Sequence, residues 1–519
     1  MKQNQRFSRL ILLFCLAVIL SFPALAQKKT IDKLDKMFAK SLADFNVPGM
    51  SISIVKNNEV VLSKGYGVKN VETGEVVDQN SLFSIASNTK AFTSACLAIL
   101  VDRGKIKWSD KVRKYLPYFQ LYSPYVSEEM TIRDLLCHRS GLATFSGDLI
   151  WYGTTYSREE VIRRASGLEP KYGFREAFGY QNIMFIAAGE IVEVVSGKTW
   201  DEFVREEILT PLAMNETNTS IREFTVGANI AMPHNEREGK NVKIDYVNWD
   251  NIGGAGSINS SANDMSKWLM LQLNKGKWGE KTIFQEDRAY EMWENQTPRS
   301  IGQWQRQNMP SRHFSGYALG WEIMDYHGYK VISHGGGYDG MISKTMFVPE
   351  LNLGFVILTN NINYLPSCLS FEILDEYIGL NSKDQIDWMK MFLDFKKADE
   401  EGMLAKAKAD EDARVKDTKP SKLLEEYAGV YTSEIYGDVE VKLNGPNELT
   451  IDFKPTALFK GSLTHYHYDS FELKWTTSMM LPSGKVTFIL NATGNVEEMK
   501  VFVENPDFDF TELKLLRSK

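Results

Sequence analysis

The stretch FSIASNTKAFTSACLAILVDRG, residues 83–104, places a serine and a lysine three positions apart at the start of a predicted helix. Residues 88–103 are apolar and compatible with a helix, and Gly104 follows as a typical C-cap. Residues three apart on a helix share one face, so Ser87 and Lys90 can act on the same group. A serine hydroxyl becomes an effective nucleophile when a neighbouring base takes its proton. Lys90 can be that base only if burial or another cation lowers its pKa.

The Ser-x-x-Lys string by itself is weak evidence for catalysis. Serine is common as a helix N-cap, and without further support that interpretation is preferred for Ser87. A second string, from Ser53 to Lys56, falls in a predicted strand at residues 50–56, where residues three apart point to opposite faces. Ser53 and Lys56 are therefore excluded as a cooperating pair. A helix N-terminus also carries free backbone N–H groups, which favour a developing oxyanion near Ser87.

A Tyr-x-Asn string occurs at a position suited to the wall of a site. Tyr180-Gln181-Asn182 directly precedes a long apolar helix, predicted to reach about residue 195, and it follows the glycine-containing loop 173–179. A second copy, at Tyr246, lies in a polar stretch where a surface tyrosine is the ordinary expectation. The first copy is therefore the candidate.

A run of three glycines follows a histidine between two strand-like segments. His334-Gly335-Gly336-Gly337 lies between the predicted strands at residues 330–333 and 342–348. Glycines at a strand let the backbone come close to a substrate and present its N–H groups. The simpler interpretations are a bulge or tight turn for the glycines and a structural role for His334.

Taken in chain order, these strings resemble the serine β-lactamase and penicillin-binding superfamily. Within it, they resemble the branch that contains class C β-lactamases, D-amino-acid peptidases and related esterases. The resemblance covers about residues 30–378, and its strength lies in the ordered set rather than in any one motif. The matching segments are Ser87-Asn88-Thr89-Lys90, residues 131–142 (TIRDLLCHRSGL), Tyr180-Gln181-Asn182, residues 211–214 (PLAM), residues 253–257 (GGAGS) with Asn263-Asp264, Leu319-Gly320-Trp321, and His334-Gly335-Gly336.

The resemblance implies a role for each matching side chain. Ser87 would be acylated, while Lys90 and Tyr180 would share the proton transfers from its hydroxyl and to the leaving group. Asn182 would hydrogen-bond the substrate amide or Lys90. The backbone N–H groups of Ser87 and Gly337 would form the oxyanion hole, where two well-aimed donors contribute several kcal/mol.

His334, with Gly335 and Gly336, departs from the pattern in one respect. Many members have a lysine of a Lys-Thr-Gly strand where this chain has His334. A lysine is a permanent cation for a substrate carboxylate, whereas histidine is charged only below its reference pKa of ~6.5. The departure argues against an efficient β-lactamase and favours peptidase, amidase, esterase or acyl-transfer activity.

We expect an α+β fold with a β-lactamase-like antiparallel sheet flanked by helices and an inserted helical region, because strands occur at both ends of a helical middle. The predicted division is a signal peptide at residues 1–26, the hydrolase domain at 27–380 and a charged helical linker at 381–420. A small all-β barrel at 421–519 would complete the chain. Five alternating strands predict that barrel, which resembles the lipocalin-like extension of some of these hydrolases; they lie at residues 438–443, 449–453, 471–475, 486–490 and 500–503.

The N-terminus predicts export. Lys2, Arg6 and Arg9 precede the apolar stretch 10–22, and Ala24-Leu25-Ala26 offers small residues for cleavage before Gln27. We therefore expect a periplasmic or secreted protein with no membrane span after signal removal. The chain carries a net charge of −7, and −10 without the three basic residues of the signal. An acidic chain without a basic run gives no reason to expect nucleic acid as a partner.

The expected partner is a small-molecule or peptide substrate with an amide or ester bond. The sequence leaves open whether the chain forms a homo-oligomer. No cofactor and no metal site are predicted. An acyltransferase that passes the same acyl group to an alcohol or amine is an alternative. A catalytically silent penicillin-binding or peptide-sensing protein is a further one, but it has no need for Ser87, Lys90 and Tyr180 together. The aromatic residues Trp151, Tyr152, Tyr156 and Trp249 line either a pocket or the core.

Overall fold

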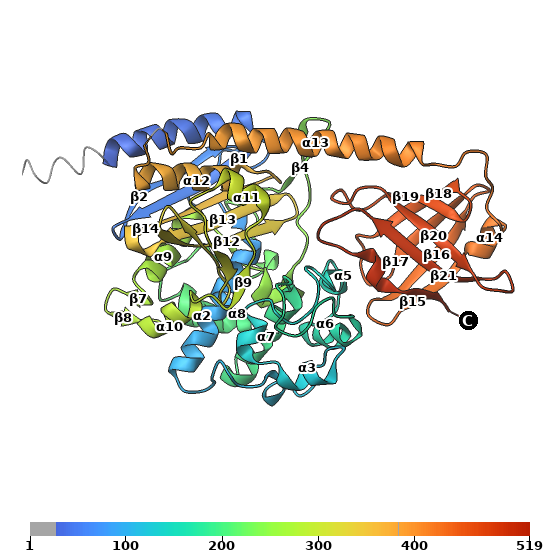
Figure 1. Ribbon diagram of the computed structural model, residues 1–519, viewed down its shortest axis with the longest axis horizontal. Helices are drawn as coiled ribbons and strands as arrows, with labels where there is room; N and C mark the ends of the chain where they lie inside the picture. Colours follow the sequence, from blue (N-terminus) through green and yellow to red (C-terminus); the bar gives the residue numbers. More distant parts are fainter. Residues whose placement is uncertain (1–26, 382, 519) are drawn as a thin grey trace, which may run out of the picture.

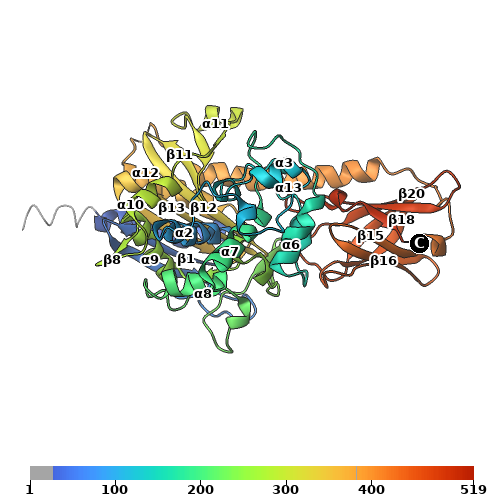
Figure 2. The same cartoon turned by 90° about the horizontal axis from the view of Figure 1, so that it is seen from below.

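The computed structural model describes residues 27–381 and 383–518. It contains a sheet domain and a closed β-barrel, joined by the long helix α13 (Trp388–Asp412). Figure 1 shows α13 running along the sheet domain, beside a helix over residues 27–44, and on to the barrel. Figure 2 shows the barrel at one end of an elongated molecule, with α6 (Arg158–Arg164) facing it. The predicted signal peptide, residues 1–26, lies outside the described residues.

The main sheet joins strands from both ends of the sheet domain, as expected. Its order is β2-β1-β14-β13-β12-β11-β10-β9, and all neighbours are antiparallel. Asn57 and Asn58 turn the first hairpin with φ of 53° and 64°, the left-handed conformation that such short turns need. The strands are β1 (Gly49–Lys56), β2 (Glu59–Gly67), β9 (Thr297–Arg299), β10 (Ser315–Tyr317), β11 (Glu322–Tyr326), β12 (Tyr329–Tyr338), β13 (Met341–Val348) and β14 (Leu353–Thr359).

Strand β14 shows why this sheet is buried on both faces. Phe355 and Ile357 pack into one hydrophobic cluster with the helix over residues 27–44 and α12 (Leu365–Ile378). Val356 and Leu358 point the other way, into a cluster that contains the apolar residues of the central helices. Successive strand side chains alternate between faces, and full burial of each such side chain contributes ~1.5–3 kcal/mol. The result is a sheet between two helical layers.

The layer on the second face carries the candidate site. Its core helices are α2 (Thr89–Asp102), α7 (Asn182–Ser196) and α9 (Ala262–Leu273). Shorter helices of this layer are α3 (Pro124–Glu129), α4 (Ile132–Leu135), α5 (Asp148–Trp151), α8 (Trp200–Val204) and α10 (Glu286–Met292). Helix α11 (Gln303–Asn308) lies on the first face, where Trp304 packs against Phe395 of α13 with ring centroids 5.1 Å apart. No helix of the described residues is long and apolar enough to cross a bilayer.

The C-terminal unit is a closed barrel of strands β15 to β22 in sequence order, as expected. The five expected strands form, and β15, β18 and β22 complete the closure. A bulge between His465 and His467 interrupts the alternation of β18, and β22 has three residues. The strands are β15 (Gly429–Ser433), β16 (Gly437–Asn444), β17 (Glu448–Phe453), β18 (Lys460–His467), β19 (Ser470–Trp475), β20 (Gly484–Leu490), β21 (Val496–Val503) and β22 (Leu515–Arg517).

The first turn of α13 is attached to the sheet domain by Trp388. This side chain is fully buried, its ring stacks on Phe371 with centroids 4.3 Å apart, and its Nε1 donates to Asp375 Oδ2 at 2.8 Å. Later residues of α13 are largely exposed. The charged segment is therefore solvated along most of its length and anchored at its start.

We expect Trp388→Ala to destabilise the sheet domain by about 3–5 kcal/mol, because it leaves a large cavity and an unpaired Asp375 oxygen. The measurement is thermal unfolding followed by near-UV circular dichroism. Met403→Ala on the same helix is the control, since Met403 is 66% exposed. Equal unfolding temperatures for both variants would show that Trp388 does not anchor the helix.

Candidate active site

Ser87 is the accessible residue of a buried turn. Every other residue between 81 and 100 is buried. Ser87 lies in a 3₁₀ turn, Ala86–Asn88, that leads into α2. Ala86 has a φ of 44°, a left-handed conformation that costs an alanine ~1–2 kcal/mol. Such strain persists only where surrounding contacts impose it.

The contacts that hold this turn come from β13. Asn88 Nδ2 donates to Ser343 Oγ at 2.8 Å and to the carbonyl of Ile85 at 3.2 Å. Ser343 Oγ in turn donates to the Ile85 carbonyl at 2.8 Å. These bonds join both sides of the turn to the sheet, so Ser87 has a fixed position at its surface.

The three glycines after His334 lie inside strand β12 and do not form a turn. His334 pairs with Thr345 and Gly337 with Ile342 of β13. A Cβ on Gly336 would lie 2.1 Å from the Ile85 carbonyl oxygen and 2.4 Å from Ser343 Oγ. Glycine at this position therefore lets β12 lie against the Ser87 turn. Gly335 and Gly337 line the same cavity as Ser87.

Lys90 is fully buried and has three hydrogen-bond partners. Its Nζ lies 2.9 Å from Ser87 Oγ, 2.7 Å from Asn182 Oδ1 and 2.8 Å from the Ala255 carbonyl. A neutral amine has two N–H bonds and one lone pair. The amide and carbonyl oxygens can only accept, so they take the two N–H bonds and leave the lone pair for the hydroxyl proton of Ser87.

The orientation of Asn182 depends on Asp148, which the sequence did not single out. Asn182 Nδ2 donates to Asp148 Oδ2 at 2.7 Å, so Oδ1 faces Lys90. Trp151 Nε1 donates to the other carboxyl oxygen at 2.9 Å. Burial raises the pKa of Asp148 to about 8. Burial lowers the pKa of Lys90 to about 7, although the Asp148 charge acts in the opposite direction.

Tyr180 lies over Lys90 in a group of aromatic rings. Lys90 Nζ is 4.8 Å from the centroid of the Tyr180 ring, and the centroid of the His138 ring is 4.1 Å from that of Tyr180. Burial raises the pKa of Tyr180, and the neighbouring Ser87 hydroxyl lowers it by less. Tyr180 is therefore protonated at neutral pH and suited to donate a proton.

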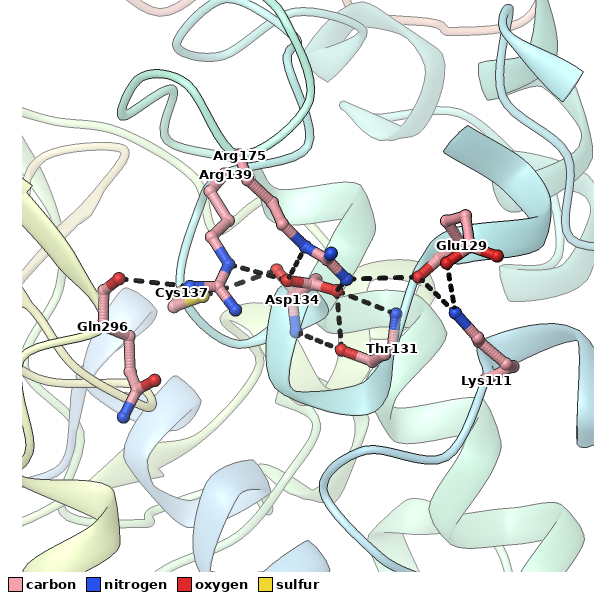
Figure 3. Close-up of polar contacts among 8 residues, drawn as sticks. All are labelled: Lys111, Glu129, Thr131, Asp134, Cys137, Arg139, Arg175 and Gln296. Carbon is pink, nitrogen blue, oxygen red and sulfur yellow. Dashed lines mark hydrogen bonds and ion pairs between the residues drawn. The ribbon is translucent and has the colours of Figure 1, made fainter. Parts of the chain in front are cut away.

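The loop before Tyr180 is held by a buried carboxylate. Asp134 accepts hydrogen bonds from Arg139 Nε at 2.6 Å and from Arg175 Nη2 at 2.7 Å (Figure 3). It also closes the capping box of α4 with Thr131. Burial raises the pKa of Asp134, but the hydrogen bonds of Arg175 and Thr131 outweigh burial and hold the pKa below its usual value. The motif at residues 131–142 therefore fixes the scaffold behind Tyr180.

His334 is a neutral residue here. Its Nδ1 donates to the Gly335 carbonyl at 2.6 Å, and its Nε2 accepts from the Tyr317 hydroxyl at 2.8 Å. Burial lowers the pKa of His334 to about 4. Two cations, Arg299 and Lys344, both contact Glu322, at 3.0 Å and 3.4 Å. Arg299 also lines the cavity.

The candidate residues open into a cavity of about 710 Å³. Ser87, Tyr180, Asn182 and His334 line it, whereas Lys90 lies beneath. The wall includes Trp151, Tyr152 and Trp249, while the hydroxyl of Tyr156 donates to the Tyr436 carbonyl of the barrel. The barrel contributes lining residues that sequence reasoning missed: Met480, Leu481, Asn505, Asp507 and Phe508.

Neither rival string reaches this cavity. Ser53 is buried in β1 and its Oγ donates to the Leu62 carbonyl at 3.1 Å. The Tyr246 hydroxyl donates to the Ala231 carbonyl at 2.6 Å.

Known proteins resemble this chain in sequence and in fold. The family model described as "Beta-lactamase" matches residues 34–364, and a "Domain of unknown function (DUF3471)" matches residues 413–517. The unguisins hydrolase ungD' of Aspergillus campestris is 27% identical over 391 residues, 70% of each chain. Protein flp of Staphylococcus aureus strain N315 is 28% identical over 345 residues, 64% of each chain. The octameric penicillin-binding protein homologue from Pyrococcus abyssi superposes with a TM-score of 0.61 at 22% identity, covering 94% of this chain and 100% of that one.

We expect Gly336→Ala to lower the unfolding temperature and to slow any reaction at Ser87, because its methyl group overlaps the Ile85 carbonyl. Overpacking of this kind costs ~1–3 kcal/mol. The matched control is Gly335→Ala, where the nearest atom is 3.9 Å away. Differential scanning calorimetry of both variants makes the comparison, and an equal loss in both would refute the steric explanation.

Proposed function

The chain belongs to the beta-lactamase family, and we propose that it is an exported hydrolase that forms an acyl-enzyme on Ser87 with amide or ester substrates. That it is a serine hydrolase of the β-lactamase-like superfamily follows from the family match and from the hydrolases among its relatives. Export rests on the signal-like residues 1–26. The acyl-enzyme rests on the hydrogen bonds of Lys90.

The proposed reaction begins when Lys90 takes the hydroxyl proton of Ser87. Ser87 Oγ then forms a bond to the substrate carbonyl carbon, and the carbonyl oxygen gains the negative charge. The backbone N–H groups of Ser87 and Gly337 would stabilise this oxyanion. The C–N or C–O bond breaks as Tyr180 gives its proton to the leaving group, and the proton on Lys90 replaces it. A water molecule then gives a proton to the same pair as its oxygen bonds to the acyl carbon. The bond from this carbon to Ser87 Oγ breaks, the proton passes to Ser87 Oγ, and the acid is released.

The neutral state of His334 supports a substrate other than a β-lactam. The position supplies no cation to a substrate carboxylate near pH 7, because its pKa is about 4. Arg299 lines the cavity, and Glu322 already pairs with it. We therefore propose peptidase, amidase or esterase activity as the main reaction.

Labelling with a fluorophosphonate tests the nucleophile. We expect intact-mass spectrometry to show one adduct on the wild type and none on Ser87→Ala. Ser53→Ala, which changes the other Ser-x-x-Lys serine, should be labelled like the wild type. An adduct that survives in Ser87→Ala would falsify the assignment, and no adduct on the wild type would favour a silent binding protein. Adding alcohol or amine acceptors to a turnover assay then separates transfer from hydrolysis.

The rate of Ser87 labelling should rise with pH. Lys90 must be neutral to accept the proton, and with a pKa of about 7 its neutral fraction increases about tenfold from pH 6 to pH 8. Second-order labelling constants across this range measure the effect. Lys90→Met should remove the rise and leave slow labelling. A flat profile for the wild type would exclude Lys90 as the base.

A further inference from the structure

The two ends of the cavity differ in charge. It follows β12 from His334 to Tyr338, a span of about 14 Å at the rise of an extended strand. Arg299 lies at the His334 end, with Lys344 and Glu322 beside it. The other end, next to the barrel, has carboxylates.

Asp339 and Asp507 are the carboxylates of the barrel-side end. Asp339 follows β12, and its Oδ1 accepts a hydrogen bond from the Tyr152 hydroxyl at 2.9 Å. Its Oδ2 is buried and has no hydrogen-bond partner among the described residues. Asp507 lies in the loop after β21, where Asn505 Oδ1 accepts from its backbone N–H at 2.8 Å and fixes the loop. Within the described residues, neither carboxylate forms an ion pair with Lys, Arg or His.

Aromatic rings enclose this end of the cavity. Tyr152 lies 4.5 Å from Phe508 of the barrel, measured between ring centroids. Trp249 lies 5.1 Å from Trp151 and 4.6 Å from Tyr338. Rings of this kind attract organic cations through their faces, and in an apolar enclosure an uncompensated carboxylate is costly. Burial raises the pKa of Asp339 to about 7, and the charge of Asp507 adds to that effect. A cation between the two carboxylates would relieve both costs.

The position of Tyr180 indicates which part of a substrate reaches this end. Its ring centroid is 6.3 Å from that of His334, so the proton donor is on the His334 side of the cavity. The leaving group must lie where it can receive that proton. The acyl part therefore extends the other way along β12, toward Asp339.

We propose that Asp339, Asp507 and Tyr152 form a subsite for a protonated amine on the acyl part of the substrate, so that the barrel takes part in substrate selection. The proposal rests on the acyl-enzyme function only for the direction in which the substrate lies. The preferred substrates are then aminoacyl amides or esters with a free amino group. N-acylated counterparts would bind poorly, because their amide cannot supply the cation.

Calorimetry on the Ser87→Ala variant of the full chain tests binding without turnover. The probes are an aminoacyl p-nitroanilide with a free amine and its N-acetyl counterpart, each as L and D isomers. We expect the free amine to bind at least tenfold more tightly, as charged hydrogen bonds predict. Asp339→Asn, which can keep the Tyr152 hydrogen bond, and Asp507→Asn should each reduce that preference about tenfold. Asp509→Asn is the matched control, since it lies in the same loop but not on the cavity.

The outcomes separate this proposal from the acyl-enzyme. Equal binding of both probes to the parent protein, unchanged in Asp339→Asn and Asp507→Asn, overturns the amine subsite even if the fluorophosphonate still labels Ser87. Selective amine binding that these variants abolish upholds the subsite even if Ser87 is not labelled. A loss of preference in Asp509→Asn as large as in Asp507→Asn also overturns the proposal, because general charge would then explain it.

Discussion

The site depends on a buried lysine that forms no ion pair within the part of the chain that the structure describes. Lys90 is fully buried, and its hydrogen-bond partners are a hydroxyl, an amide oxygen and a backbone carbonyl. Burial of an uncompensated ammonium is costly, and a buried lysine relieves the cost by releasing its proton. Because burial lowers the pKa of Lys90, part of the amine is neutral near pH 7, and its lone pair can accept the proton of Ser87. Any change that admits water or a carboxylate to this position would favour the charged form.

The segments around Lys90 are built to keep it in this state. Thr93 Oγ1 donates to the Gly254 carbonyl at 2.6 Å. A Cβ on Gly254 would lie 2.8 Å from Thr93 Oγ1. This close packing presents the next carbonyl, that of Ala255, to Lys90. Asp148 controls which end of Asn182 faces the amine. Asp148 also has a pKa raised by burial, so it orients the amide at a smaller electrostatic cost than a fully ionised neighbour.

The sequence predicted the parts of the site that follow local periodicity. Helical spacing brought Ser87 and Lys90 to one face, and alternation located five of the eight barrel strands. Asp148 was missed because its hydrogen bond to Asn182 joins residues far apart in the chain, and nothing in its neighbours marks it as special. From the sequence, the glycines of β12 were compatible with a strand, a bulge or a turn. Their pairing with β13 and the approach of Ile85 to Gly336 distinguish these. In the barrel, the bulge at His465 broke the alternation on which the strand prediction relied.

The place of the barrel over the cavity follows from how it is attached. Helix α13 has 25 residues and spans ~37 Å at the rise of an α-helix. Trp388 anchors its first turn in the sheet domain, and Arg414, just beyond its end, donates to the Tyr466 carbonyl of β18 at 3.0 Å. At a second point of attachment, the Gly147 N–H donates to Glu512 at 2.8 Å, beside α5. Attachment at both points restricts rotation of the barrel, so its loop at residues 505–508 keeps one position over the cleft. A flexible tether could not place Asp507 and Phe508 accurately enough to select a substrate, since selection requires lining groups that are already in position before the substrate binds.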